Sequence, residues 1–277
     1  MAATQSKQTY RLLAVDMDGT VLNREKQITS ATRQAIEKAL AAGKDVVFAT
    51  GRCPSEMREY LNQFPQMRYA MSLSGALIFD LRAGVTLSET NLSPALVEQI
   101  LAAAEGLDVM AVLYAGNEVY LERCRRGNLA HFWCDCYTAL YEVCGNWVER
   151  STDVLSFGES IRKINFFCHT AEDYQALQGR MAHLPVSLAQ GSINNCEVSP
   201  RGVDKGVGLE MLCRAAGIST QEAIAVGDSG NDMAMLRAAG LAVAMENATE
   251  EVRALADVIV ADCDRDGVAE AIEKFLL

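Results

Sequence analysis

Two carboxylates, Asp16 and Asp18, stand two residues apart directly after the apolar run Leu12–Val15. A short apolar run followed by Gly19 and Thr20 predicts a buried strand that runs into a loop. Open α/β sheets bind their ligands at the carboxyl ends of parallel strands. Because two acids crowded there cannot both remain bare anions, the pair predicts a bound cation, a proton or both. Metal-assisted, nucleophilic or acid–base chemistry would follow.

An Asp-x-Asp pair alone also fits a solvated turn, but two further apolar runs end in polar loops. Residues 46–49 run into Thr50-Gly51-Arg52, and residues 223–226 run into the polar segment 227–232. Lys205 stands in the first turn of a predicted helix. Three strands that each end in a polar loop, together with a lysine, predict one site at one edge of a sheet.

On these motifs the chain resembles the haloacid dehalogenase superfamily of phosphatases, in its Cof-type branch with a large inserted cap. The matching segments are DMDGTVLN at 16–23, TGR at 50–52, GVDKG at 202–206, GDSGNDMAML at 227–236, and the ADV and DGV segments at 256–258 and 266–268. They keep the family's order and roughly its spacing. Residues 85–190 match only in length and coarse pattern.

The resemblance implies a phosphoryl-transfer site. Asp16 would attack phosphorus and form an aspartyl phosphate, and Asp18 would protonate the leaving alcohol and then activate water. Magnesium would be held by the Asp16 side chain, the Asp18 backbone carbonyl and the Asp228 side chain, with Asp232 orienting its neighbours. Lys205 would pair with Asp16 and with a phosphate oxygen.

The resemblance also implies further phosphate contacts, from the Met17 and Gly51 amides, the Thr50 hydroxyl, Lys205 and the Asn231 side chain. For Arg52 a role at the site and a structural ion pair both stay open. Two segments depart from the family pattern. Ser74-Gly75-Ala76 replaces Asn-Gly-Ala, which is expected to change a hydrogen bond near the leaving group. Glu246 replaces the glycine of Met-Gly-Asn-Ala and adds a charge to its loop.

Composition argues against several other classes of protein. The chain has 277 residues, is 50% hydrophobic and carries a net charge of −11. Its one short basic run, residues 123–126, is too small for a nucleic-acid footprint. No apolar run approaches membrane-spanning length, and residues 1–11 lack the apolar core of a signal peptide. We expect a cytoplasmic monomer or homodimer that binds a small phosphorylated metabolite, with no nucleic-acid or membrane partner.

The nine cysteines fit free thiols in a reducing compartment. Cys134-Asp135-Cys136, with Cys124, Cys144 and His131 nearby, leaves zinc binding as a minor alternative. The Cys-x-Cys spacing is not one of the common zinc-finger spacings. Cys53, next to Arg52, is expected to be inert.

Periodicity and breakers predict an α/β fold: a doubly wound, Rossmann-like parallel-sheet core with an inserted α+β cap domain. Core helices are expected at 31–42, 54–63, 205–216, 231–239, 249–255 and 268–276, and core strands at 45–49, 69–73, 76–79, 223–226, 241–245 and 258–260, with a flap at 21–28. The cap should hold helices at 93–105 and 172–183, a hairpin over 108–122, and strands at 161–169 and 186–189 in an antiparallel sheet. The expected division is core at 1–86 and 191–277, with the cap at 87–190.

We therefore interpret the chain as a magnesium-dependent phosphomonoesterase acting on sugar phosphates or phosphorylated cofactors. A phosphotransferase or mutase on the same core, and a non-catalytic metabolite-binding regulator, are the alternatives. The presence of Asp16, Asp18, Lys205, Asp228 and Asp232 argues against a retired site. The substrate itself is not predicted, because residues 85–190 contain no motif.

Overall fold

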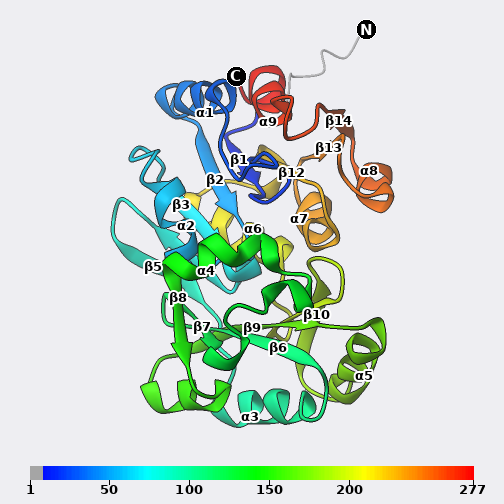
Figure 1. Cartoon of the computed structure of the whole chain (residues 1–277). Coiled ribbons are helices and arrows are strands. Elements are labelled where there is room, and N and C mark those ends of the chain that lie inside the picture. Colours follow the sequence, from blue (N-terminus) through cyan, green and yellow to red (C-terminus); the bar gives the residue numbers. More distant parts are fainter. Residues whose placement is uncertain (1–8) are drawn as a thin grey trace, which may run out of the picture.

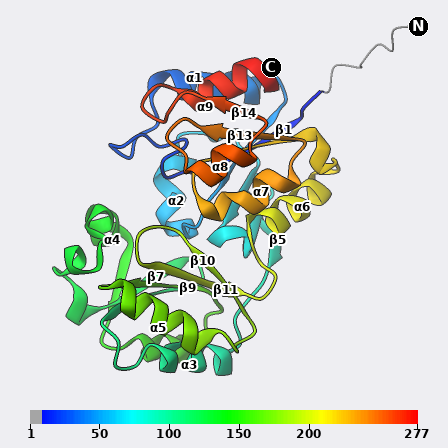
Figure 2. The ribbon, with the colours of Figure 1, turned by 90° about the vertical axis from the view of Figure 1, so that its right-hand side faces the viewer.

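The computed structural model describes residues 9–277. The expectation that residues 1–11 contain no signal peptide therefore lies almost wholly outside the described residues. The chain forms two β-sheets in separate lobes, shown one above the other in Figures 1 and 2. Residues at both ends of the described chain build the upper lobe, and the middle of the chain builds the lower one. This arrangement confirms the predicted α/β core with an inserted cap. Within residues 9–277, no helix is both long and apolar enough to cross a membrane.

The core sheet has eight strands in the order β14-β13-β12-β1-β2-β3-β4-β5. Their bounds are β1 Leu12–Val15, β2 Asp45–Ala49, β3 Tyr69–Ser72, β4 Leu77–Asp80, β5 Val85–Glu89, β12 Ala223–Gly227, β13 Leu241–Met245 and β14 Val258–Val260. The six strands from β14 to β3 are parallel, whereas β4 and β5 pair antiparallel at the edge. The chain moves outward from β1 in one direction and outward from β12 in the other, so the strand order reverses beside β1. Such a reversal is where open α/β sheets open a ligand-binding crevice.

Helices cover both faces of the core sheet because side chains of a strand alternate between its two faces. Leu13 and Val15 pack with Ile36 and Ile272 on one side, while Leu12 packs with α6 and α7 on the other. The helices are α1 Ser30–Ala41, α2 Pro54–Leu61, α6 Lys205–Ala216, α7 Met233–Ala238, α8 Glu250–Leu255 and α9 Gly267–Ala271, which continues as a π-helical turn over Ile272–Leu276. The sheet is thus doubly wound, as predicted.

The cap sheet has six strands in the order β10-β11-β9-β6-β7-β8. Its strands are β6 Val109–Ala115, β7 Glu118–Glu122, β8 Gly145–Val148, β9 Ile161–Cys168, β10 Val186–Gln190 and β11 Asn195–Pro200, and its helices are α3 Pro94–Ala103, α4 Thr138–Cys144 and α5 Ala171–Met181. All pairs are antiparallel except β7 with β8. Residues of α3 and α5 pack on one face of this sheet, and the other face turns toward the core.

Three strands, β5, β8 and β11, were not expected from the sequence, and two of them move the expected boundaries. β5 extends the core sheet to Glu89, and β11 belongs to the cap sheet through its pairing with β9 and β10. The two crossings therefore follow Glu89 and Pro200 rather than residues 86 and 190. The helix expected at 231–239 begins as a 3-10 turn over Gly230–Asp232, and residues 21–28 form a turn-rich loop.

Candidate active site

The site lies where β1, β2 and β12 end, at the reversal of strand order. Asp16 follows β1 and is only 5% exposed. Gly19 turns the chain with φ +85, and a Cβ there would come within 2.6 Å of Asp228 Oδ2, so the loop needs glycine at this position. Asn247 Nδ2 donates a hydrogen bond of 2.8 Å to the Gly19 carbonyl oxygen. The first motif is thereby folded against the loops after β12 and β13.

Lys205 connects the first motif to the last one. Its ammonium group is fully buried and lies 2.5 Å from Asp16 Oδ1 and 2.7 Å from Asp232 Oδ1. Asp204 caps α6 by accepting from the Val207 amide at 2.9 Å, which fixes the helix start that carries the lysine. Burial acts to lower the pKa of Lys205, but the two carboxylates outweigh it and raise the pKa above its ordinary value. The lysine is therefore a permanent cation beside Asp16.

Asp16, Asp228 and Asp232 each offer an oxygen, and these oxygens lie within 4.8 Å of one another. Burial, with Asp232 and Asp228 adding to it against Lys205, raises the pKa of Asp16 well above its usual range. Burial and the nearby Asp232 raise the pKa of Asp228 to about 7. One lysine does not compensate this much buried negative charge. Oxygen ligands of this kind fit Mg²⁺, which prefers carboxylates together with water.

Asp232 is the member of this cluster whose oxygens are already engaged. Its Oδ1 accepts from Lys205, and its Oδ2 accepts from the backbone amides of Asp228 and Ser229 at 3.0 Å each. Asp228 is bonded only through Oδ1, which accepts from the Thr20 hydroxyl at 3.0 Å. The geometry thus favours Asp16 and Asp228 as the side chains that would hold an ion, with Asp232 orienting the loop and the lysine.

Asp18 is held by two cations. Arg52 Nε and Nη2 each donate to it at 2.7 Å, and Lys26 Nζ donates at 2.7 Å. Burial would raise the pKa of Asp18, but Arg52 and Lys26 outweigh it, so the pKa falls well below its usual range. Of the two roles left open for Arg52, the structure shows the ion pair, and its partner is a candidate catalytic residue.

Of the five predicted phosphate-binding residues, three line a cavity, whereas Met17 and the fully buried Lys205 do not. Thr50, Gly51 and Asn231 line this cavity of about 80 Å³ together with Asp16 and Asp18. The Met17 side chain is instead fully buried in the hydrophobic core, so only its backbone could serve a ligand. The Thr50 hydroxyl accepts from the Arg52 amide at 3.2 Å, which shapes this loop.

The cap closes the cavity with residues that sequence reasoning missed. Lys163 from β9 is fully buried and reaches across to the core, with its Nζ 3.2 Å from the Gly51 carbonyl oxygen and 3.2 Å from Ser74 Oγ. Glu197 from β11 lies 2.7 Å from Lys163 and accepts from the Ser74 hydroxyl at 3.1 Å. The cap's charge pair thus meets the core at Ser74, which replaces the family's asparagine.

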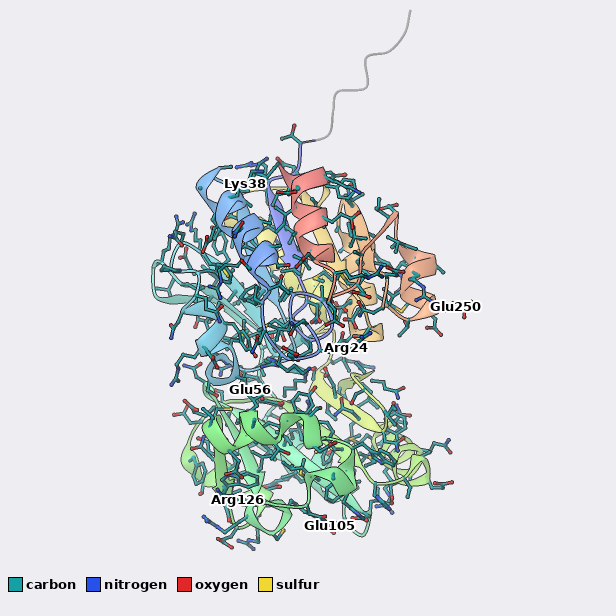
Figure 3. The ribbon with its side chains drawn as sticks, turned by 45° about the horizontal axis from the view of Figure 1, so that its top comes forward. Arg24, Lys38, Glu56, Glu105, Arg126 and Glu250 are labelled. Atoms are coloured by element: carbon teal, nitrogen blue, oxygen red, sulfur yellow. The ribbon has the colours of Figure 1, made fainter. Side chains whose placement is uncertain are left out.

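Apolar contacts and one buried acid complete the junction between cap and core. Leu73 and Leu77 of the core share a hydrophobic cluster with Val112, Tyr141 and Phe167 of the cap. Glu56 lies at this boundary, as Figure 3 shows. It is 3% exposed and lines the cavity, and its Oε2 accepts from the Cys53 amide at 2.7 Å.

The second departure from the family pattern, Glu246, pairs with Arg265 at the surface.

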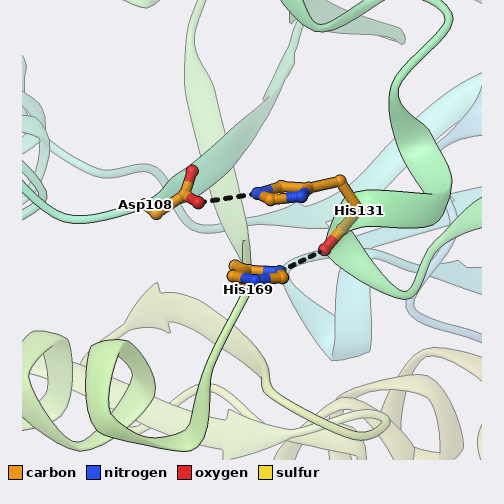
Figure 4. A group of neighbouring side chains, drawn as sticks. All are labelled: Asp108, His131 and His169. Carbon is orange, nitrogen blue, oxygen red and sulfur yellow. Dashed lines mark hydrogen bonds and ion pairs between the residues drawn. The ribbon is translucent and has the colours of Figure 1, made fainter.

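A second group of possible metal ligands, Asp108, His131 and His169, lies in the cap (Figure 4). His131 Nε2 is 2.6 Å from Asp108 Oδ2, and His169 Nδ1 is 2.8 Å from the His131 carbonyl oxygen. The two imidazole rings stack with centroids 3.8 Å apart and planes 5° apart. Because the nitrogen lone pairs lie in the ring planes, parallel rings do not converge on one ion. We interpret this group as an ion pair with a stacked neighbour.

All nine cysteines lie in the described part of the chain, and each is a free thiol. Neither group of potential ligands found among residues 9–277 contains a cysteine. The structure therefore gives no support to the zinc alternative built on residues 124–144. Burial, with Glu56 adding to it, raises the pKa of Cys53 well above its usual range, in line with the expected inert thiol.

A buried carboxylate at the reversal point of a doubly wound sheet, paired with a lysine and backed by further acids, is the arrangement expected of an α/β hydrolase. The comparisons with known proteins agree. Residues 13–272 match the haloacid dehalogenase-like hydrolase family, and the chain belongs to this family. Several of its curated relatives are named phosphatases, and the chain is a phosphatase of the Cof type.

Two relatives and one solved structure illustrate the likeness. A 5-amino-6-(5-phospho-D-ribitylamino)uracil phosphatase of Bacillus subtilis is 29% identical over the whole of both chains. A pyridoxal phosphate phosphatase of Escherichia coli is 24% identical over 97% of this chain and 100% of the relative. The solved structure of a haloacid dehalogenase-like hydrolase from B. subtilis, 26% identical, superposes with a TM-score of 0.85 over 96% of this chain and 100% of that one.

Proposed function

We propose that this chain is a magnesium-dependent phosphomonoesterase that hydrolyses small phosphorylated metabolites through an aspartyl phosphate on Asp16. The observation that carries the proposal is the position of Asp16. It is buried at the tip of β1, 2.5 Å from Lys205, and it faces a cavity that the cap closes. Asp16 lines the cavity, pairs with the buried cation Lys205 and belongs to the acidic cluster with Asp228 and Asp232.

The residues around Asp16 supply charge compensation. Lys205 can pair with an incoming phosphate oxygen while it keeps Asp16 in place, and the Thr50 hydroxyl and Gly51 amide can donate to the other oxygens. Asp16 and Asp228, with the Asp18 carbonyl, would hold Mg²⁺, which when bound offsets the repulsion between a phosphate dianion and the attacking carboxylate. The crowded acids of this cluster fit that cation, because their burial with one lysine leaves them under-compensated.

Asp18 is positioned to act on the leaving group, but it is an anion in this state. We infer that the phosphate draws the guanidinium of Arg52 and the ammonium of Lys26 toward itself, since it is the larger negative charge. The pKa of Asp18 then rises, and the residue can protonate the leaving alcohol and later activate water. Arg52 lines the cavity, so its guanidinium is within reach of a ligand bound there.

Substrate size follows from the small volume of the cavity. A buried water needs roughly 10–15 Å³ on the same measure, so the 80 Å³ cavity takes a handful of waters or one small leaving group. Small phosphorylated metabolites, rather than phosphoproteins, fit this space. The free cysteines further suggest a reducing compartment such as the cytoplasm.

The direct test is release of inorganic phosphate from a panel of phosphorylated metabolites, with magnesium and with excess chelator. Water must be the only phosphate acceptor in the assay, so that a phosphotransferase would release little. Asp16→Asn serves as the inactive control. Magnesium-dependent release by the native chain and its loss in the variant support the proposal. No release from any ester by folded protein would overturn it.

A further inference from the structure

We propose that the site selects phosphate monoesters whose leaving alcohol carries one uncharged aromatic ring with an N–H or O–H donor that Asn165 Oδ1 accepts. The inference rests on the proposed phosphatase function and adds the class of leaving group. It comes from the cap wall of the cavity, which no catalytic motif reaches.

The strand β9 presents its polar and aromatic residues to the cavity in alternation. Ile164 and Phe166 point into the cap's own core, so residues 163, 165 and 167 share the opposite face, because strand side chains repeat every second residue. On that face Lys163 contacts the core loops, and both Asn165 and Phe167 line the cavity. A continuous buried strand thus offers one amide and one ring to a ligand.

Aromatic rings dominate the rest of this wall. Tyr114, Tyr137 and Tyr141 line the cavity beside Phe167. The ring of Tyr137 lies 5.7 Å from Tyr141 and 6.0 Å from Phe167, centroid to centroid. Burial raises the pKa of each of the three tyrosines well above its usual range, so all three are neutral. Rings at this spacing favour another ring in the offset or edge geometry that aromatic pairs adopt.

Asn165 contains a buried polar atom that lacks a partner. The residue is 6% exposed, and its Nδ2 donates to the Tyr114 hydroxyl at 3.4 Å. Its Oδ1 is buried and unpaired, one of three such side-chain atoms among residues 9–277; the other two, Arg125 Nε and Arg162 Nε, do not line this cavity. An unmet buried acceptor is costly, and a donor on the ligand would satisfy it.

The charges of the wall argue against polyol or doubly anionic leaving groups. Lys163 and Glu197 neutralise each other at 2.7 Å, and Ser74 is bonded to both. Among the described residues, this wall therefore offers no unpaired cation that could bind a second phosphate or a carboxylate. The ring faces of Tyr137, Tyr141 and Phe167 offer no hydrogen-bond partner to the several hydroxyl groups of a sugar, and each unmet hydroxyl would weaken binding. A single ring with one donor matches both the space and the polarity.

The test uses four kinds of ester that share the same CH₂–O–phosphate group. They are cyclohexylmethyl phosphate, benzyl phosphate, and the hydroxybenzyl and methoxybenzyl phosphates in their matching ring isomers. We expect kcat/KM for benzyl phosphate to exceed that for cyclohexylmethyl phosphate by roughly two- to tenfold. For at least one isomer, the hydroxy ester should exceed the methoxy ester by roughly fivefold, the worth of one hydrogen bond.

Two variants locate the effect. In Asn165→Leu the hydroxy-to-methoxy ratio should fall to about one. Phe157→Leu, a matched control at an exposed cap aromatic away from the cavity, should leave both ratios unchanged. If Asn165→Leu does not fold, the substrate ratios of the native chain still decide. If kcat/KM for the cyclohexylmethyl ester equals that for the benzyl ester, the preference for an aromatic ring is wrong. If kcat/KM is equal for the hydroxy and methoxy esters, the requirement for a donor is wrong.

Binding of the corresponding non-hydrolysable phosphonates, measured by calorimetry, separates this inference from the proposed function. Ring and donor preferences in Kd without turnover of any ester would keep the leaving-group assignment and reject the phosphatase. Turnover of all esters without either preference would keep the phosphatase and reject the assignment.

Discussion

Arg52 donates two hydrogen bonds of 2.7 Å, from Nε and Nη2, to the two carboxylate oxygens of Asp18. A bidentate pair of this geometry is strong and planar, and Lys26 adds a third contact at 2.7 Å. Asp18, the proposed general acid, is therefore an anion in this structure. We propose that phosphate binding frees it for acid catalysis, because a competing anion would draw the two cations away.

Asp18→Asn should lower kcat for benzyl phosphate by roughly 100- to 10,000-fold, the usual contribution of a positioned general acid. The loss for p-nitrophenyl phosphate should be much smaller, since nitrophenolate leaves without a proton. Steady-state kinetics on both esters measure the difference. Asp264→Asn, at an exposed carboxylate that pairs with Arg24, is the control. Equal losses on both esters would contradict the acid role.

Asp16→Asn should reduce phosphate release by roughly a thousandfold or more, as loss of a nucleophile does elsewhere. The amide keeps the shape but cannot form the acyl phosphate. The fold should persist, because Lys205 retains Asp232 at 2.7 Å. Circular dichroism and phosphate release on the same sample check both parts. Substantial activity in a folded variant would remove Asp16 as the nucleophile.

Excess chelator should abolish activity, and magnesium should restore it, whereas calcium should not. Calcium takes more ligands at longer and more variable distances, which misplaces an in-line attack on the phosphate. Phosphate release after dialysis against each ion is the measurement. Asp228→Asn should raise the magnesium concentration needed for half-maximal activity, while Asp264→Asn should leave it unchanged. Full activity in chelator would reject the cation.

Lys163→Met should destabilise the protein by about 3 kcal/mol, because it leaves the buried Glu197 carboxylate without its partner. Lys163→Met combined with Glu197→Gln should recover part of this loss, since no charge is then left unpaired. Urea denaturation gives the free energies of unfolding. Lys274→Met removes an exposed i,i+4 pair with Glu270 and should cost measurably less. An equally mild effect at Lys163 would show that the buried Glu197 carboxylate does not depend on this partner.

The same pair predicts a pH dependence of stability. Burial would raise the pKa of Glu197, but Lys163 outweighs it and lowers the pKa below its ordinary value. A carboxyl with a depressed folded pKa stabilises the protein above its unfolded pKa, about 4.3, and that contribution is lost as pH falls through the folded value. The free-energy difference between the native chain and Glu197→Gln should therefore be constant near neutrality and shrink in acid. A difference that grew on acidification would contradict the sign.

The sequence by itself determined the core and predicted which residues form the candidate site. Asp16, Thr50, Lys205 and Asp228 were predicted because each follows a strand or begins a helix within a dense motif, and the structure brings their elements to one edge of the sheet. The core helices and the parallel strands were predicted within a few residues, because apolar periodicity and glycine breakers are local signals. The roles of these residues in catalysis stay predictions.

Only the tertiary structure decided what the site contacts and how the cap meets it. The ion pair of Asp18 with Arg52 joins loops after two different strands, and no spacing in the sequence predicts which loops lie side by side. β5 and β11 were missed because strand identity at a domain crossing depends on the partner strand, not on local pattern. Lys163 and Asn165 interrupt an apolar strand, and only the register of β9 beside β11 turns them toward the cavity. Their meaning depends on pairing between distant segments, which side-chain chemistry along the chain does not fix.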